Sequence, residues 1–150
     1  MEILEMSEAE CLRKLGQTKF GRLACARDNQ PYVVPVYFAF DGRHIYGFTT
    51  LGQKVEWMRL NPQVCLEIDE RSSDDTWLSV VVFGRYEELP DEPRFGTART
   101  IAHQLLQQRS AIWWEPATSS KRNKSLALTP IVYRIHIRQI TGYRTSPNEE

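Results

Sequence analysis

The chain has 150 residues, of which 41% are apolar and 25% charged, and its 19 basic and 19 acidic side chains leave no net charge. These values are typical of a globular protein with a real core, so we expect a single domain over residues 1–150. No apolar run has the length of a membrane span, and the acidic N-terminus MEILEMSEAE lacks the basic and apolar regions of a secretory signal.

The cysteines indicate a cytoplasmic protein. Cys11, Cys25 and Cys65 are odd in number, far apart and not flanked by His or a second Cys. We therefore expect reduced, partly buried thiols and neither a disulfide framework nor a metal site.

Charge is distributed unevenly, because residues 94–144 carry nine Lys or Arg against Glu115 alone. A basic segment of this kind suits nucleic acid, an anionic cofactor, the acidic part of a second subunit, or merely a solvated face. Stacking aromatics interleaved with Lys or Arg are lacking outside Trp113-Trp114, so we expect no nucleic-acid partner.

Apolar periodicity and turn residues divide the chain into strands and a few short helices. Ser7 and Glu10 form a capping box at the start of a helix that Gly16 can close in the left-handed conformation. Strands are expected at residues 20–27, 32–40, 44–49, 64–69, 77–89 and 131–143, and helices also at 52–60 and after Pro93. Six strands, mostly antiparallel by their short connections, predict a mainly β fold, a closed or nearly closed barrel.

Two of these strands carry further expectations. Asp41-Gly42 favours a tight hairpin turn with positive dihedrals before the strand at 44–49. The strand at 77–89 is rich in Val and contains Phe83 and Tyr86, which suggests burial on both faces.

The junction between the strand at 44–49 and the next helix offers groups that suit a phosphate ester. Thr49 and Thr50 supply two hydroxyls, the helix start near Gly52 supplies unpaired backbone N–H groups, and Lys54 supplies an ammonium. The alternative is an ordinary crossover from strand to helix whose lysine is solvated.

The order and spacing of several segments resemble the FMN-binding split barrels related to pyridoxamine 5′-phosphate oxidase. These segments are FGRLA at 20–24, PYVVPV at 31–36, FTT at 48–50 with GQK at 52–54, NPQVC at 61–65 and SVVVFGR at 79–85. The resemblance extends from about residue 7 to 143 and is nearest to small bacterial members of the nitroimidazole-resistance type. It implies a six-stranded split β-barrel and a homodimer with two FMN molecules at the subunit interface.

The resemblance also assigns cofactor contacts by position. Thr49, Thr50 and Lys54 would meet the FMN phosphate, with Gln53 in the same loop. The strand residues Val34, Pro35, Val36 and Tyr37 would pass beside the isoalloxazine, and Ser79 falls where the oxidases have a glutamine that touches the ring. Trp113 and Trp114 would stack on or cover the flavin, or would instead pack at the dimer interface.

Departures from the oxidases indicate a different substrate. The oxidases have an arginine where this chain has Val33-Val34, an Arg-Lys pair where it has Gln53-Lys54, and an Arg-rich C-terminal motif that is absent here. Arg22 or a basic residue of the C-terminal third is expected to compensate for the lost cations. We therefore do not expect pyridoxamine phosphate to be the substrate.

No side chain is identified as catalytic, because His44, His103 and His136 are expected to be solvated or structural. The flavin would supply the chemistry, accepting hydride from a nicotinamide or another small donor. Our first interpretation is a small FMN-dependent oxidoreductase of nitro or quinone-like compounds. The alternatives are a flavin- or haem-binding module without turnover, with His44 or His136 as haem ligands, and a nucleic-acid-binding barrel.

Overall fold

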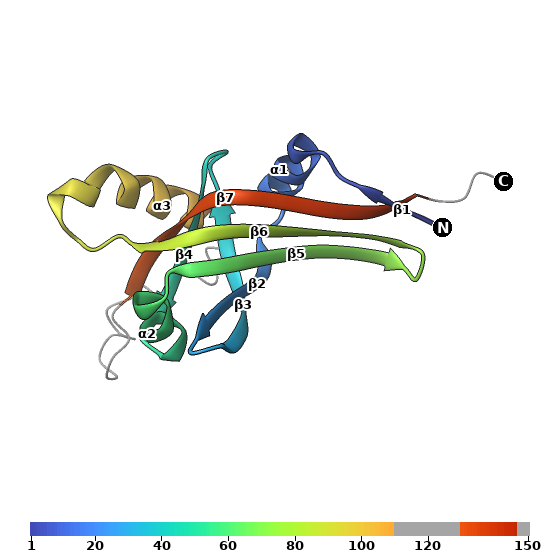
Figure 1. Cartoon of the computed structure of the whole chain (residues 1–150). Helices are drawn as coiled ribbons and strands as arrows, with labels where there is room; N and C mark the ends of the chain where they lie inside the picture. The colour runs from blue at the N-terminus through green and yellow to red at the C-terminus, as the bar shows by residue number, and fades with distance from the viewer. Residues whose placement is uncertain (110–129, 147–150) are drawn as a thin grey trace.

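The computed structural model describes residues 1–109 and 130–146 and contains seven strands in this part of the chain (Figure 1). The strands are β1 (Glu2–Glu5), β2 (Phe20–Arg27), β3 (Gln30–Phe40), β4 (His44–Thr50), β5 (Gln63–Ser73), β6 (Thr76–Glu88) and β7 (Pro130–Ser146). The helices are α1 (Glu8–Gln17), α2 (Gln53–Leu60), the short 3₁₀ helix η1 (Pro93–Phe95) and α3 (Gly96–Arg109). The mainly β architecture expected from the sequence is confirmed.

The strands form one antiparallel sheet that closes on itself. Their order is β1-β7-β4-β3-β2-β5-β6, and an additional pairing of β6 with β7 closes the ring. The six predicted strands, β2 to β7, make up this barrel. The seventh strand, β1, lies outside it and pairs with the C-terminal part of β7, from Glu2 opposite Ser146 to Glu5 opposite Tyr143.

Three details of the predicted elements are corrected. Helix α1 has the predicted capping box, but it ends at Gln17 with Thr18 as its cap, and Gly16 is not left-handed. The tight turn with two positive φ angles is Asp28-Asn29, at 48° and 64°, and β3 therefore begins at Gln30 rather than at residue 32. Between β3 and β4 only Gly42 has a positive φ, of 95°, in a three-residue connection.

The expectation that β6 is buried on both faces is wrong. Val80, Val82 and Tyr86 face the core, whereas Phe83 on the other face is 43% exposed. The sequence did not reveal this alternation because the outward residues Val81 and Phe83, in the middle of the strand, are themselves apolar.

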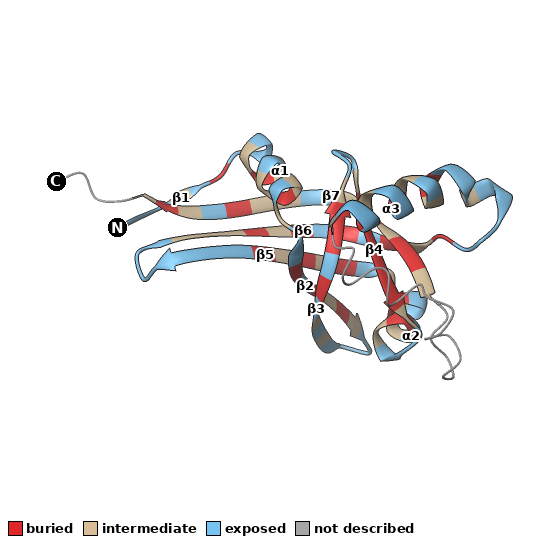
Figure 2. Ribbon diagram, turned by 180° about the vertical axis from the view of Figure 1, so that it is seen from behind, coloured by how far each residue is buried: buried red, intermediate tan, exposed pale blue. Residues whose placement is uncertain are grey.

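Two apolar clusters lie on opposite sides of β4 and β7. The barrel interior contains Ile45 and Ile135 and is closed at one end by Cys11 and Leu15 of α1. The second cluster, outside the barrel, packs α3 against the other faces of these strands; it consists of Ala39, Tyr46, Phe48, Leu89, Ala98, Ala102, Leu106 and Val132. Figure 2 shows the resulting stripes of buried residues along β3 and β4 and on the inner side of α3. No helix in the described ranges is long and apolar enough to cross a membrane.

Gly47 is required by the packing inside the barrel. It lies on β4 opposite Tyr133 of β7, whose ring is fully buried. A Cβ atom at residue 47 would overlap the ring and hydroxyl of Tyr133. The tyrosine thus fills the volume that a side chain at residue 47 would need.

We expect Gly47→Ala to lower the free energy of unfolding by about 3 kcal/mol, because overpacking forces a core ring out of its rotamer. Urea denaturation measures this change. The matched control is Gly96→Ala at the start of α3, where an added Cβ meets no atom within 4 Å and the residue is already helical. Equal stabilities of the two variants would contradict the packing argument.

Candidate functional site

The barrel opens where β3 and β4 separate. These strands pair only at Phe38 opposite Gly47, Ala39 opposite Tyr46 and Phe40 opposite Ile45. From there β4 continues along β7 as far as Thr50, opposite Pro130, whereas β3 continues along β2 as far as Gln30, opposite Arg27. Residues 30–36 of β3 therefore pair with β2 only, and their other backbone edge has no strand partner among the described strands.

This open edge is the segment that the sequence assigns to the flavin ring. Alternate backbone groups of a strand point to opposite sides, and the Phe38 N–H donates toward β2, to the Lys19 carbonyl at 3.0 Å. By this alternation the carbonyl of Pro35 faces the opening. Pro35 has no N–H to donate, so at that position the edge offers an acceptor alone.

Across the opening, β4 delivers Thr49 and Thr50 to the start of α2. Thr49 is 9% exposed, and its hydroxyl lies 3.4 Å from the Thr50 carbonyl, which is a long and weak hydrogen bond. Gly52 is the N-cap of α2, and no side chain of residues 1–109 or 130–146 caps the helix. The first N–H groups of this helix therefore have neither an intrahelical acceptor nor a side-chain cap.

Lys54 lies in the first turn of α2 and is partly buried. Among the described residues no carboxylate forms an ion pair with its ammonium, and the group near it is the Cys25 thiol of β2. Loss of solvent lowers the pKa of Lys54, and burial raises the pKa of the Cys25 thiol. A desolvated cation beside uncapped helical amides is an arrangement that an anion would stabilise.

Contacts with β2 and β3 fix the orientation of α2. The Trp57 ring packs on Tyr32 of β3, with ring centroids 5.5 Å apart. At the helix end the Asn61 side-chain amide donates to the Ala26 carbonyl of β2 at 3.1 Å. Because α2 starts from β4 and packs on β2 and β3, its N-terminus is held at one end of the opening.

The structure brings together some of the predicted cofactor residues and separates others. The start of α2 brings together Thr49, Thr50, Gln53 and Lys54, and we call these four residues the α2 corner. The segment 34–37 lies along the open edge of β3. Ser79 is on β6 opposite Tyr143 of β7. Thr49 is opposite Ile131 of β7. Ile131 and Tyr143, the β7 partners of Thr49 and Ser79, are twelve residues apart, or about 40 Å along the strand at roughly 3.3 Å per residue. Ser79 is therefore remote from the α2 corner of its own protomer. Trp113 and Trp114 lie outside the described residues.

Three of the cations that could compensate for the missing arginines have other partners, whereas Lys121, Arg122 and Lys124 lie outside the described residues. Arg22 donates to Glu67 at 3.1 Å and to Asp69 at 2.7 Å. Arg134 donates from Nε to Glu87 at 2.6 Å, and Arg138 donates to Gln63. Lys54 is thus the cation that the described residues leave at the corner.

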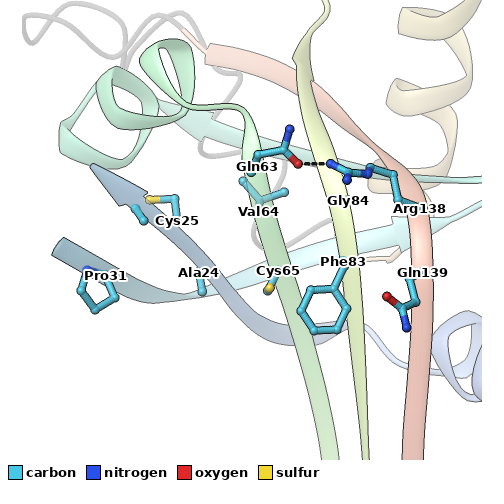
Figure 3. A pocket seen from close by; sticks show the side chains of 11 residues that line it. Ala24, Cys25, Pro31, Gln63, Val64, Cys65, Phe83, Gly84, Arg138 and Gln139 are labelled. Atoms are coloured by element: carbon cyan, nitrogen blue, oxygen red, sulfur yellow. Dashed lines mark hydrogen bonds between the residues drawn. The ribbon is translucent and has the colours of Figure 1, made fainter. Parts of the chain in front are cut away.

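A groove of about 540 Å³ lies on the outer face of the barrel, over β2, β5, β6 and β7 (Figure 3). Val33, Ala24, Cys65 and Phe83 are consecutive partners across β3, β2, β5 and β6 and point to this outer face. We call these four residues the outer apolar row. Val33 is 60% exposed and Phe83 is 43% exposed, so the row presents apolar surface to solvent in the single chain.

Sequence reasoning also missed a polar cluster on the α3 side of β4 and β7. His44 and His136 are partners across the two strands, with ring centroids 4.8 Å apart, and Glu87 lies 3.0 Å from His136 Nε2. The sequence does not reveal this because residues 44 and 136 meet only through the strand register.

Comparisons with known proteins agree with this geometry. The family model described as pyridoxamine 5′-phosphate oxidase matches residues 7–144. An uncharacterized protein of Rhizobium meliloti (strain 1021) is 45% identical over 116 residues, which are 77% of this chain and 76% of the relative.

Solved structures extend the similarity to the whole fold. An FAD-binding protein from Mesorhizobium loti is 41% identical, with a TM-score of 0.80 and coverage of 97% of this chain and 100% of that one. A Bacteroides thetaiotaomicron protein that is described as a 5-nitroimidazole antibiotic resistance protein shares the fold at 16% identity. Its TM-score is 0.68, and the match covers 96% of this chain and 89% of that one. The chain therefore belongs to the pyridoxamine 5′-phosphate oxidase family, with the split-barrel fold of that family.

Proposed function

We propose that this protein is a flavin-dependent oxidoreductase whose α2 corner holds the phosphate on the ribityl chain of FMN, a phosphate that FAD also carries. The observation that carries the proposal is Lys54, a desolvated cation without a carboxylate partner among the described residues, beside uncapped helical amides. A phosphate dianion would gain charge-assisted hydrogen bonds from both kinds of donor. The Mesorhizobium loti relative, described as FAD-binding, supports a flavin ligand.

The open edge of β3 would orient the ring. Val34, Pro35, Val36 and Tyr37 run from the β2 pairing toward the point where β4 departs. Polar atoms on the flavin ring can pair with backbone groups that no neighbouring strand uses. The strand therefore provides direction and hydrogen bonds without a side-chain acid or base.

The reaction that we propose is electron transfer from a reduced nicotinamide to a nitro or quinone-like acceptor. When bound, the flavin supplies the hydride chemistry, and the protein contributes binding, orientation and exclusion of water. Pyridoxamine phosphate is not proposed as the substrate, because Arg134 and Arg138 of β7 already pair with Glu87 and Gln63. Unpaired cysteines at 11, 25 and 65 support a cytoplasmic location.

A homodimer is part of this proposal. The outer apolar row crosses four strands beside a groove of about 540 Å³, and exposed apolar surface of this kind marks an interaction site. Within one protomer Ser79 lies far along β7 from the α2 corner. A two-fold partner would bring a second copy of β6 to the opening, and with it a second Ser79.

The first test uses Lys54→Met, which keeps most of the aliphatic stem and removes the charge. We expect FMN binding to weaken by roughly 100-fold and riboflavin binding by less than about threefold, since only FMN carries the phosphate. Calorimetric titration of both ligands measures the difference, and Lys19→Met, at an exposed lysine, is the control. Equal losses for FMN and riboflavin would exclude the phosphate role.

The same variant has an expected effect without ligand. Because the pKa of Lys54 is lowered below its ordinary 10.5, the unfolded chain binds a proton more readily than the folded chain. The wild-type free energy of unfolding should therefore increase as pH rises from the lowered pKa to the ordinary one. In Lys54→Met this increase should be absent, and at neutral pH the ligand-free protein should gain about 1 kcal/mol.

The second test separates an enzyme from a binding module. The protein reconstituted with FMN or FAD should lose its yellow absorption on anaerobic addition of NADH or NADPH and regain it when a quinone is added. A flavin that binds tightly but stays oxidised with every nicotinamide would assign the protein to the non-catalytic class. A Soret band in the purified protein would indicate haem instead.

The third test concerns the dimer. Phe83→Glu places a charge in the outer apolar row, and we expect a monomer in analytical ultracentrifugation with a folded circular dichroism spectrum. Flavin binding should fall with the loss of the partner. The control is Leu60→Glu, at the C-terminal end of α2, which is outside the row and 67% exposed. A dimeric Phe83→Glu protein would show that the interface lies elsewhere.

A further inference from the structure

A second pocket of about 500 Å³ lies outside the barrel, between the β3–β4 connection and the start of α3. Its charged and aromatic lining comes from Arg43, His44, Tyr46, Arg94, Phe95 and Arg134, with Asp41 and Glu87 beside them. These residues belong to β4, β6, β7 and η1 and the connections next to them, on the side that α3 covers (Figure 1). The pocket is thus separated from the flavin opening by the β4–β7 strand pair.

The two carboxylates of the pocket are already engaged. Asp41 accepts from the backbone N–H groups of Arg43 at 2.8 Å and His44 at 2.6 Å, and from the Tyr46 hydroxyl at 3.2 Å. Glu87 accepts from Arg134 Nε at 2.6 Å and lies 3.0 Å from His136 Nε2. These contacts stabilise the turn and the sheet edge, and they compensate the negative charge of the two carboxylates.

The guanidinium groups retain unused donors. Arg134 donates to Glu87 through Nε. Burial and Asp41 raise the pKa of the Tyr46 hydroxyl, and the nearby Arg134 opposes this rise. Arg43 forms no side-chain hydrogen bond or ion pair with any described residue. Arg94 donates through Nε to Glu92 at 3.0 Å, outside the pocket. Three arginines therefore present more donors than the pocket's own acceptors use.

The electrostatic environment of His44 is positive, as the excess of arginine donors over acceptors predicts. Burial lowers the pKa of His44, and His136, Arg134 and Arg43 lower it further, against the opposing effect of Asp41. Positive charge thus dominates around the imidazole. An anion in the pocket would reduce this repulsion.

Apart from Thr97, the remaining wall is apolar, and the Arg94 guanidinium lies 4.7 Å from the Phe95 ring centroid. Phe95, Ala98 and Ile101 line it from η1 and α3, and all three pack in the cluster between α3 and the sheet. A hydrated inorganic ion would leave this wall unused. A ligand with one anionic group and a flat apolar body would contact both parts of the lining.

We propose that this pocket binds a small organic acid, with its carboxylate between Arg134 and Arg43 and its apolar body against Phe95 and Ile101. The site uses none of the residues assigned to the flavin. The proposal can therefore be tested independently of the proposed oxidoreductase function.

Benzoate and its neutral analogue benzamide test the proposal. Calorimetric titration of the flavin-free protein should give a dissociation constant of about 1 mM or lower for benzoate and at least tenfold weaker binding of benzamide. In NMR titrations the His44 resonances should shift, and benzoate should raise the pKa of His44. Equal affinities for the two compounds, or no binding of benzoate up to about 20 mM, would overturn the proposal.

Variants assign the binding to this pocket. Arg43→Gln should weaken benzoate by about fivefold and Arg43→Glu by more than about 20-fold, because the second change also repels the carboxylate. Arg43 is exposed, so both proteins should fold even where Arg134→Gln, which leaves Glu87 without its Nε partner, does not. Arg13→Gln, at an exposed arginine of α1, is the matched control. Wild-type affinity in Arg43→Glu would refute this site.

Discussion

The separation of β3 from β4 is the constraint on which the rest of the structure depends. The two strands pair at three positions, and then β4 follows β7 while β3 follows β2. Gly47 permits the pairing of β4 with β7, because it leaves room for the buried Tyr133 ring opposite it. One separation creates both an unpaired edge on β3 and, at the end of β4, the helix start that carries Lys54. The two parts of the proposed flavin site therefore follow from a single topological event.

The residues of the α2 corner lower the stability of the free protein and favour the binding of an anion. A lysine that loses solvent without gaining a carboxylate costs folding free energy, and uncapped helical amides add to this cost. Other cations of the described chain do gain a carboxylate partner, as Arg59 does with Glu88 at 2.6 Å. The corner is thus locally unfavourable in the free protein, and an anionic ligand would reverse that balance.

Local signals predicted most elements, because turn residues and apolar period act over a few positions. The capping box at Ser7 and Glu10 and the helix predicted at residues 52–60, which is α2 in the structure, are of this kind. The four-residue strand β1 was missed, since it exists only through its pairing with β7. For β6 the pattern could not distinguish a face that meets the core from one that is exposed, because Val81 and Phe83 are as apolar as Val80 and Val82. The cluster of His44, His136 and Glu87 depends on register across three strands, which no local pattern encodes.

The family resemblance predicts a phosphate at the α2 corner, and the ion pairs limit how far the resemblance extends. Cationic residues alone did not reveal whether Arg22, Arg134 or Arg138 could replace the arginines that the oxidases have. In the structure Arg22 donates to Glu67 and Asp69. Arg134 donates to Glu87, and Arg138 donates to Gln63. A phosphate at the corner would then rely on Lys54, helical amides and hydroxyls of the described chain. With Lys54 as the cation that the described residues offer, a bound phosphate would gain less from this part of the chain than from the several cations of the oxidases, and the ring contacts would carry more of the affinity.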